Sequence, residues 1–264
     1  VSWALWLPAT ALALLGLVGD RFDVSPKLRL VIQFLASLTF LWGMGYRPGS
    51  GYSELLLVLG LSIFVVGTAN FYNFMDGING IAGVTGIVAF ALLGWSARAA
   101  VEPAGYGPMA FAIACACVGF LPFNMPGAKV FMGDVGSILL GFAFATMAIV
   151  HSRSFFDLVC ASAFLLPFYA DELTTMAIRL RSRENLLDPH RRHLYQLLVN
   201  ECGLAHWKTS LAYGLAQAAC GLLILGAKPL GWSAVLSVWM VFWAGFLGLN
   251  AWVRGRYAQP SRVR

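Results

Sequence analysis

Long apolar segments, separated by short polar stretches, dominate this sequence and limit what it can fold into. A helix needs about 20 mostly apolar residues to cross a bilayer. We therefore predict an all-α, polytopic membrane helical bundle of about nine transmembrane helices, forming a single domain over residues 1–264. The predicted spans lie near residues 2–18, 28–44, 55–72, 80–97, 107–124, 136–151, 155–177, 209–226 and 231–253.

The composition excludes an ordinary soluble domain. Only 11% of the 264 residues are charged, whereas 59% are hydrophobic. A soluble domain of this length carries roughly a quarter charged residues. The five cysteines lack metal-ligand spacing, and we interpret them as small packing residues.

The basic residues predict the orientation of the bundle. If the loops near 19–27, 69–79, 124–135 and 178–208 share one side with the C-terminal tail, that side and the adjoining helix ends hold fourteen of the 18 Lys and Arg residues. Basic residues mark the cytoplasmic side of short-looped membrane proteins. This side and the C-terminus are therefore predicted to be cytoplasmic, and the net charge of +6 requires no nucleic acid partner. Contact of the tail with anionic lipid is an alternative reading of its charge.

Four polar clusters fall on this predicted cytoplasmic face. A carboxylate within hydrocarbon is costly and usually faces a watery cavity or a partner. Clusters dispersed in sequence but gathered on one face indicate a single site built from several helix ends. Their sequences are GDRFDVSPKLRL at 19–30, NFYNFMDGINGIAG at 70–83, AKVFMGDVGS at 128–137 and LLDPHRRHLYQLL at 186–198.

The cluster at 70–83 places Asn73, Asp76 and Asn79 three residues apart. On a helix, each of these side chains would neighbour the next. Its glycines would let a ligand or another backbone approach closely, or let the helix break there. The alternative is a small-residue helix interface with paired polar groups.

The cluster at 128–137 places Asp134 just before a span that begins near Gly136. An acid there either caps the helix or serves as a magnesium ligand, because Mg²⁺ prefers carboxylate and phosphate oxygens. Phe131 either anchors the chain at the membrane interface or stacks on a base. Asp20 joins such a metal site only if it converges with Asp76 and Asp134.

The cluster at 186–198 has the pattern of a helix start. Asp188 is a suitable N-cap and Pro189 fits the first helical position. If that helix continues, His190 and His193 share a face, and two arginines lie between them. Such a group would bind a diphosphate. The alternative is an amphipathic loop lying on anionic headgroups.

These motifs resemble those of a known family. The polyprenyl-phosphate N-acetylhexosamine-1-phosphate transferases, glycosyltransferase family 4, carry an Asn-x-x-Asn-x-x-Asp-Gly-x-Asp-Gly signature, which the stretch NFYNFMDGINGIAG resembles. FMGDVGS is similar to their Phe-Met-Gly-Asp-x-Gly-Ser motif. GDRFDVSPKLRL resembles the stretch around their Asp-Asp pair, and PHRRHLYQLL their histidine-containing loop. The resemblance runs from about residue 10 to 200, in family order.

The resemblance implies a reaction and its partners. Family members transfer a sugar-1-phosphate from a UDP-sugar to a polyprenyl phosphate such as undecaprenyl phosphate, and UMP leaves. The implied cofactor is Mg²⁺, with Mn²⁺ as an alternative ion. The implied location is the bacterial inner membrane among membrane lipids, and a homodimer is left open. The sequence His-Arg-Arg-His resembles the N-acetylglucosaminyl branch, which starts O-antigen and other surface glycans, more than the phospho-N-acetylmuramoyl-pentapeptide transferases.

The resemblance also implies roles for individual residues. Asp134 would be catalytic and hold the metal. Asp20 would be catalytic too, either holding the metal or acting on the lipid-phosphate nucleophile, and Asp76 would be a catalytic or nucleotide-positioning acid. The remaining implied groups are catalytic His190 and His193, and substrate-binding Asn73, Asn79, Phe131, Arg191, Arg192 and Lys27.

Three departures from the family pattern keep alternatives open. The acidic pair reads Gly19-Asp20, and the later acid of the signature is Asn79. The family has ten or eleven spans, so two helices are expected upstream of Val1. The alternatives are a degenerate member that binds a nucleotide-sugar or lipid carrier without turnover, and a pentapeptide transferase. An unrelated transporter would carry its polar groups near mid-span, whereas these lie at one face.

Overall fold

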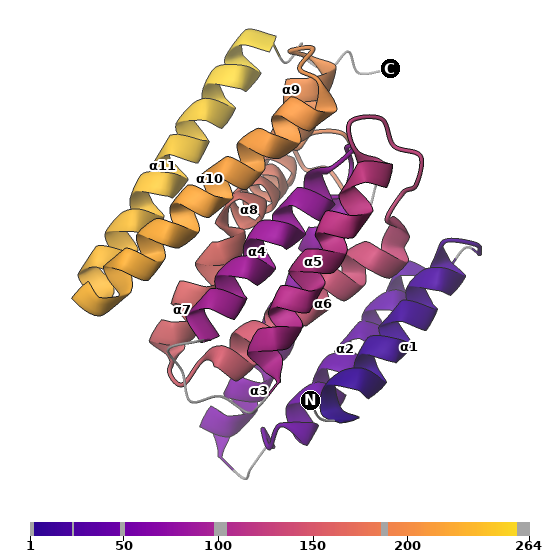
Figure 1. The fold of residues 1–264 in the computed structure, drawn as a ribbon, viewed down its shortest axis with the longest axis vertical. Coiled ribbons are helices and arrows are strands. Elements are labelled where there is room, and N and C mark those ends of the chain that lie inside the picture. Colours follow the sequence, from indigo (N-terminus) through magenta and orange to yellow (C-terminus); the bar gives the residue numbers. More distant parts are fainter. Residues whose placement is uncertain (1–2, 23, 48–50, 98–104, 186–189, 258–264) are drawn as a thin grey trace.

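The computed structural model describes residues 3–22, 24–47, 51–97, 105–185 and 190–257. Within these ranges the chain is helical and contains no strand (Figure 1). The helices are α1 (Trp3–Gly19), α2 (Pro26–Gly43), α3 (Tyr52–Phe74), α4 (Ile81–Ala97), α5 (Tyr106–Asn124), α6 (Gly133–His151), α7 (Phe155–Ser162), the 3₁₀ turn η1 (Ala163–Leu165), α8 (Leu166–Arg181), α9 (Leu194–Asn200), α10 (His206–Ala227), the 3₁₀ turn η2 (Lys228–Leu230) and α11 (Trp232–Tyr257).

Helix α6 lies in the core of the bundle and packs against α1, α3 and α4. Edge-on aromatic pairs fill this core, with ring centroids 6.3 Å apart for Phe40 and Phe142 and 6.2 Å apart for Phe90 and Phe144. Such pairs add stability beyond the area they bury. The pair α1–α2 forms one edge of the bundle, and α10–α11 forms the opposite edge (Figure 1).

Among the residues that the structure describes, five helical segments are long and apolar enough to cross a membrane: α3, α5, α6, α10 with η2, and α11. Helices α1 and α4 are apolar but shorter, at 17 residues each. Large apolar side chains stay exposed on outward faces, such as Leu56, Leu215 and Val241. Exposed apolar surface of this extent is typical of contact with lipid. The structure is therefore consistent with the predicted membrane bundle, and the count of nine spans stays a prediction.

The predicted span at 155–177 is wrong as a single helix. The structure divides it into α7, η1 and α8, and Pro167 lies in the first turn of α8. Proline removes a backbone donor and disfavours an unbroken helix there. Gln217 of α10 donates to the carbonyl of Phe164 at 2.6 Å and to that of Thr85 at 3.2 Å. A backbone group released by the break is thus paired inside the protein, as a membrane interior requires.

The polar clusters meet at one end of the bundle. Gly16 near the end of α1 lies against the start of α6, where a Cβ atom would come within 2.4 Å of the Val135 Cα. The side chain of Ser25 accepts from Leu28 N and starts α2 close by. At the opposite end, Lys228 pairs with Asp157 at 2.6 Å. Short turns and one close backbone contact therefore bring the ends of α1, α2, α3 and α6 together.

Candidate active site

Asp134 and Asp20 form the base of the site. Asp134 lies in the first turn of α6, and Asp20 follows the last residue of α1. The Asp20 Oδ1 atom accepts a hydrogen bond from Asp134 N at 3.0 Å, so its carboxylate caps the positive end of α6. Gly133 has a φ of +67°, and a Cβ atom there would lie 2.5 Å from the Asp20 Oδ2 atom. A glycine is therefore needed for the two acids to meet.

The Asp134 carboxylate joins three helices. Arg29 of α2 forms an ion pair with its Oδ2 atom. Asn73 of α3 donates from one amide nitrogen to Asp134 Oδ1 at 2.9 Å and to Ser137 Oγ at 2.8 Å. No role for Arg29 was predicted from the sequence. Its position in the first turn of a helix within a polar cluster was the available signal.

The Arg29 guanidinium also fills the space beside Gly19. Its Nη2 atom lies 3.4 Å from the Gly19 carbonyl oxygen, and a Cβ atom on Gly19 would come within 2.8 Å of it. Gly19 departs from the family pattern, and the Arg29 guanidinium that pairs with Asp134 thus lies against it.

The spacing of Asn73, Asp76 and Asn79 does not produce a shared helical face. Helix α3 ends at Phe74, so only Asn73 is helical. Asp76 lies in the turn that follows, with its backbone N–H on the Asn73 carbonyl at 3.1 Å. Burial, and then repulsion from Asp134, raises the pKa of Asp76 to about 7. The two acids are therefore near enough to sense each other's charge.

Asn79 and Asn124 hold the loops around the site. Asn79 donates from its side chain to the Pro126 carbonyl at 3.2 Å, and its own carbonyl accepts from Ser210 Oγ at 2.9 Å. Asn124 accepts from Gly80 N at 2.6 Å and donates to the Val130 carbonyl at 2.9 Å. Asn124 was missed from the sequence because it ends an apolar helix. Both asparagines tie the α3–α4 turn to the α5–α6 loop.

These loops enclose a cavity of about 290 Å³. Phe131 is 76% exposed and lies on its rim, whereas Lys27 is exposed on α2 and does not line it. The lining comes from both loops and from the ends of α3, α5 and α6. Phe131 contributes an aromatic ring, and the polar lining residues are Asn73, Asp76, Asn79, Asn124 and Asp134.

The described residues contain no ready-made cage of three His, Cys, Asp or Glu side chains for a metal ion. Asp20 and Asp134 contribute carboxylate oxygens, but one oxygen of Asp134 is paired with Arg29. Mg²⁺ is commonly held by one or two carboxylates together with substrate phosphates rather than by a protein cage. The donors present therefore fit a magnesium ion that arrives with a phosphate ligand.

The predicted helix start in the fourth cluster is wrong at its beginning. Asp188 and Pro189 lie outside the described residues, and α9 begins at Leu194 with His193 as its N-cap. His190 is not helical, yet its ring centroid lies 4.8 Å from that of His193. The two histidines are neighbours through a loop rather than on one helical face.

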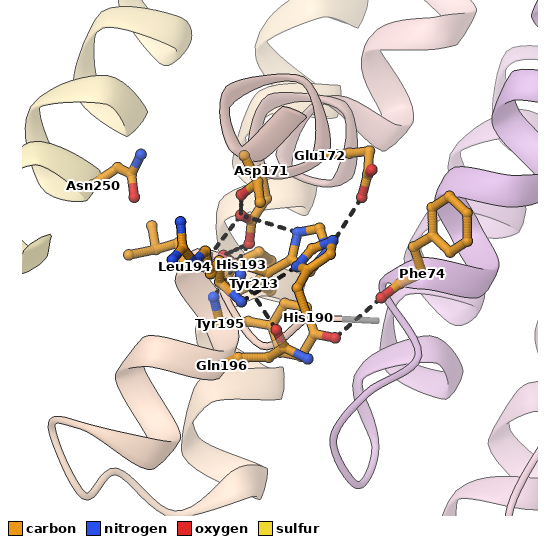
Figure 2. Close-up of polar contacts among 12 residues, drawn as sticks. Phe74, Asp171, Glu172, His190, His193, Leu194, Tyr195, Gln196, Tyr213 and Asn250 are labelled. Atoms are coloured by element: carbon orange, nitrogen blue, oxygen red, sulfur yellow. Dashed lines mark hydrogen bonds and ion pairs between the residues drawn. The ribbon is translucent and has the colours of Figure 1, made fainter. Parts of the chain in front are cut away.

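His193 is held by two acids that sequence reasoning missed. Asp171 and Glu172 of α8 are almost fully buried, and their carboxylates lie 3.6 and 3.4 Å from the two ring nitrogens of His193 (Figure 2). His193 is 2% exposed and stacks on Tyr195. Two adjacent acids in an apolar span were the signal, because such residues are rare there.

His190, Arg191 and Arg192 lie outside the residues that line the cavity. Burial, followed by the charges of His193 and Arg179, lowers the pKa of His190 to about 4. Arg192 forms an ion pair with Glu184, and Arg191 is exposed. The loop thus presents one exposed cation, and the expected diphosphate-binding role of its four residues stays a prediction.

Comparison with known proteins identifies the class of this fold and site. Residues 2–152 match the model of glycosyl transferase family 4, and the chain belongs to that family. This range includes Asp20, Asp76 and Asp134, the three acids nearest the cavity. The family predicted from the motifs is thereby confirmed.

Three relatives are similar to this chain over about three quarters of its length or more. An undecaprenyl-phosphate alpha-N-acetylglucosaminyl 1-phosphate transferase of Thermotoga maritima is 32% identical over 201 residues, 76% of this chain and 62% of the relative. A decaprenyl-phosphate N-acetylglucosaminephosphotransferase of Mycolicibacterium smegmatis is 28% identical, over 77% of this chain and 60% of the relative. A phospho-N-acetylmuramoyl-pentapeptide-transferase of Bacillus thuringiensis is 27% identical, over 80% and 70%. The chain therefore spans about three fifths of the length of the first two.

Proposed function

We propose that the protein transfers N-acetylhexosamine-1-phosphate from a UDP-sugar to undecaprenyl phosphate in a Mg²⁺-dependent reaction that releases UMP. The cavity end of the bundle would face the cytoplasm of a bacterial inner membrane. The product, a polyprenyl-diphosphate sugar, would start O-antigen or another surface glycan.

One observation carries this proposal: a polar cavity with two acids opens at the end of a bundle whose outward faces are apolar. A lipid phosphate must meet a water-soluble nucleotide at the membrane surface, and both are anions. A cavity at a helix-bundle end beside lipid satisfies both requirements. The names of the T. maritima and M. smegmatis relatives support N-acetylglucosamine as the sugar.

The chemistry requires one bond to form and one to break. An oxygen of the lipid phosphate attacks the β-phosphorus of the UDP-sugar, and the bond from that phosphorus to the bridging oxygen of the α-phosphate breaks. The electron pair leaves with UMP. A bound Mg²⁺ would offset the charge of the phosphate oxygens.

The residues of the chain would share the remaining tasks. Asp134 and Asp20 would hold the ion, and Asn73 would orient Asp134 through its 2.9 Å hydrogen bond. Asp76, with its pKa near 7, would accept or hold a proton at the cavity. Phe131 would stack on uracil from the rim.

The test is UMP release by the purified protein in detergent, with undecaprenyl phosphate, Mg²⁺ and a panel of UDP-N-acetylhexosamines. Release should need lipid and metal. Asp134→Asn should lower it at least about 10²-fold, the usual loss when one preorganised charge-stabilising group is removed.

The matched control is Asp157→Asn, because Asp157 pairs with Lys228 at the far end of the bundle. This variant removes the same charge and should keep activity within about twofold, since the ion pair is partly exposed and lies far from the cavity. Equal losses in both variants, or release without added lipid, would contradict the proposed reaction.

A second candidate function is supported by the Arg29–Asp134 ion pair. An arginine that fills the space beside Gly19 occupies the acid expected to hold metal. The protein would then bind a UDP-sugar or lipid carrier without turnover. UDP-sugar binding by calorimetry, together with no UMP release for any donor, would favour this candidate.

A further inference from the structure

We infer that Tyr195 is a positioning residue that fixes the Asp76–Gly77 turn at the mouth of the cavity, and that Asp171 holds Tyr195 in place. This inference deepens the proposed function, and rests on it in so far as Asp76 belongs to the active site. Tyr195 lies outside the lining of the cavity and would not touch substrate.

Asp171 determines where α9 begins. Its carboxylate accepts from Leu194 N at 2.7 Å and from Tyr195 N at 3.2 Å (Figure 2). The hydroxyl of Tyr213 donates to the same carboxylate at 2.6 Å. Asp171 is 1% exposed, so these donors have no water to replace it. A buried acid of α8 thus supplies the N-terminal cap of α9 from another helix.

Tyr195 links the start of α9, which Asp171 holds, to the segment beside the cavity. Its ring is fully buried, packs edge-on against Tyr213 at 6.4 Å, and stacks on His193 at 5.6 Å. Its hydroxyl donates to the carbonyl of Phe74, the last residue of α3, at 3.1 Å (Figure 2). The ring is therefore fixed on three sides, and its one polar atom contacts the segment that leads into Asp76.

Gly77 packs closely against the Tyr195 hydroxyl. A Cβ atom at Gly77 would lie 2.1 Å from the Tyr195 hydroxyl oxygen. Asp76 stands between Phe74, which accepts the hydrogen bond, and Gly77, which packs under the same hydroxyl. Asp76 lies beyond the end of α3, where its backbone N–H bonds the Asn73 carbonyl, and the contact with Tyr195 further limits how far its turn can move. A small displacement of a catalytic group lowers rate strongly.

The experiment compares two buried tyrosines that each tie α3 to another helix. Tyr195→Phe removes the hydrogen bond to the Phe74 carbonyl. Tyr169→Phe is the matched control, because its hydroxyl bonds Thr68 Oγ1 at 2.8 Å, farther from the cavity. Hydrogen exchange of residues 75–80 is measured by mass spectrometry on the full chain in detergent. Tyr195→Phe should speed exchange there about two- to tenfold, as expected for one lost hydrogen bond, and Tyr169→Phe should not.

Activity supplies the second readout. Tyr195→Phe should lower kcat for UMP release about two- to tenfold, with Tyr169→Phe unchanged. Gly77→Ala should lower kcat more, because its methyl group meets the hydroxyl. The Gly77→Ala/Tyr195→Phe double variant should recover part of that loss, since the obstructing oxygen is gone.

The outcomes separate this inference from the proposed function. Wild-type protein that releases no UMP overturns the function, while the exchange data still decide the positioning role. Unchanged exchange at residues 75–80 in Tyr195→Phe, or equal acceleration in Tyr169→Phe, overturns the inference. A double variant no better than Gly77→Ala also overturns it.

Discussion

Two clusters of acids lie at the same end of this bundle and differ in what they face. The open cluster (Asp20, Asp76, Asp134, with Arg29 and Asn73) includes two acids that line a cavity, Asp76 and Asp134, and each carboxylate oxygen of Asp134 has one partner. The closed cluster (Asp171, Glu172, His193, Tyr195, Tyr213) is almost fully buried, and Asp171 accepts hydrogen bonds from α9, α10 and its own helix. Both clusters contain aspartates, so residue type does not distinguish them. Burial and the number of hydrogen-bond partners determine whether a carboxylate is available to substrate or stabilises the fold.

The strongest way to break this comparison is to remove the central acid of the closed cluster. Asp171→Ala leaves two backbone donors and a tyrosine hydroxyl buried without an acceptor. It also removes the carboxylate beside one ring nitrogen of His193. Breaking a buried charged pair costs about 3–5 kcal/mol. We expect a large fall in the thermal midpoint in detergent, with Asp171→Asn intermediate because one side-chain oxygen remains.

The control for this substitution is Asp157→Ala, which removes a partly exposed pairing with Lys228. It should cost less than about 1 kcal/mol. A stable Asp171→Ala protein that has lost activity alone would mean that the closed cluster takes part in chemistry.

The open cluster should respond to substitution in binding rather than in stability. Phe131 is 76% exposed, so Phe131→Ala should leave the thermal midpoint unchanged. If the ring stacks on uracil, its loss should weaken UDP binding by about 1–3 kcal/mol, or roughly 5- to 150-fold. Calorimetric titration with UDP measures this, with Phe123→Ala as control because Phe123 is exposed but does not line the cavity. Equal effects in both variants would contradict stacking.

The Arg29–Asp134 ion pair offers a smaller effect within the open cluster. Its side chains are 28% and 27% exposed, so the pair should contribute only about 0.2–1 kcal/mol. Arg29→Gln removes a cation that competes with metal for Asp134. We expect divalent-ion binding, followed by Mn²⁺ paramagnetic resonance, to tighten roughly 1.5- to fivefold. Lys129→Gln removes an exposed charge from the α5–α6 loop and should change Mn²⁺ binding less. Weaker Mn²⁺ binding in Arg29→Gln would mean that arginine shapes the site instead of blocking it.

The two clusters also differ in how far the sequence revealed them. The open cluster was predicted because its residues stand in short polar stretches between apolar spans, and short loops bring such helix ends together. Of the closed cluster, only His193 was singled out from the sequence. Its two acids were missed because hydropathy averages over about 20 residues, so that Asp171 and Glu172 do not stand out within the apolar stretch 155–177. Its partners are also distant in sequence: Asp171 lies 23 residues from Leu194 and 42 from Tyr213.

For a related reason, local sequence patterns were a poor guide to the helix ends and to the contacts made there. Residues 190–193 have a plausible helical spacing, yet α9 begins at Leu194, where a carboxylate from α8 caps it. Likewise, Arg29 and Asp134 are 105 residues apart, and no periodicity links them. Tertiary partners, which local propensity does not encode, decided both features.

A pH-dependent effect is expected at Asp76, whose environment is intermediate between the two clusters. Its folded-state pKa of about 7 lies above the ordinary value of 3.8. Between these two values the folded protein holds a proton that the unfolded chain has released, so stability falls as pH rises through this window. Above pH 7 the carboxylate is charged in both states and the full penalty remains. Asp76→Asn removes the titration, so it should raise the thermal midpoint relative to wild type at pH 8 and change it little at pH 4.

Thermal unfolding in metal-free buffer with chelator at pH 4 and pH 8 measures this difference. Chelation matters because a bound divalent ion would favour the charged carboxylate and hide the effect. Asp157→Asn, which loses its pairing with Lys228, should be destabilised or neutral at pH 8 rather than stabilised. If Asp76→Asn is destabilised at pH 8, then Asp76 is already paired in the folded protein and belongs with the closed cluster. If it is stabilised, the charge of Asp76 is held at a cost that a substrate or metal ion can offset on binding.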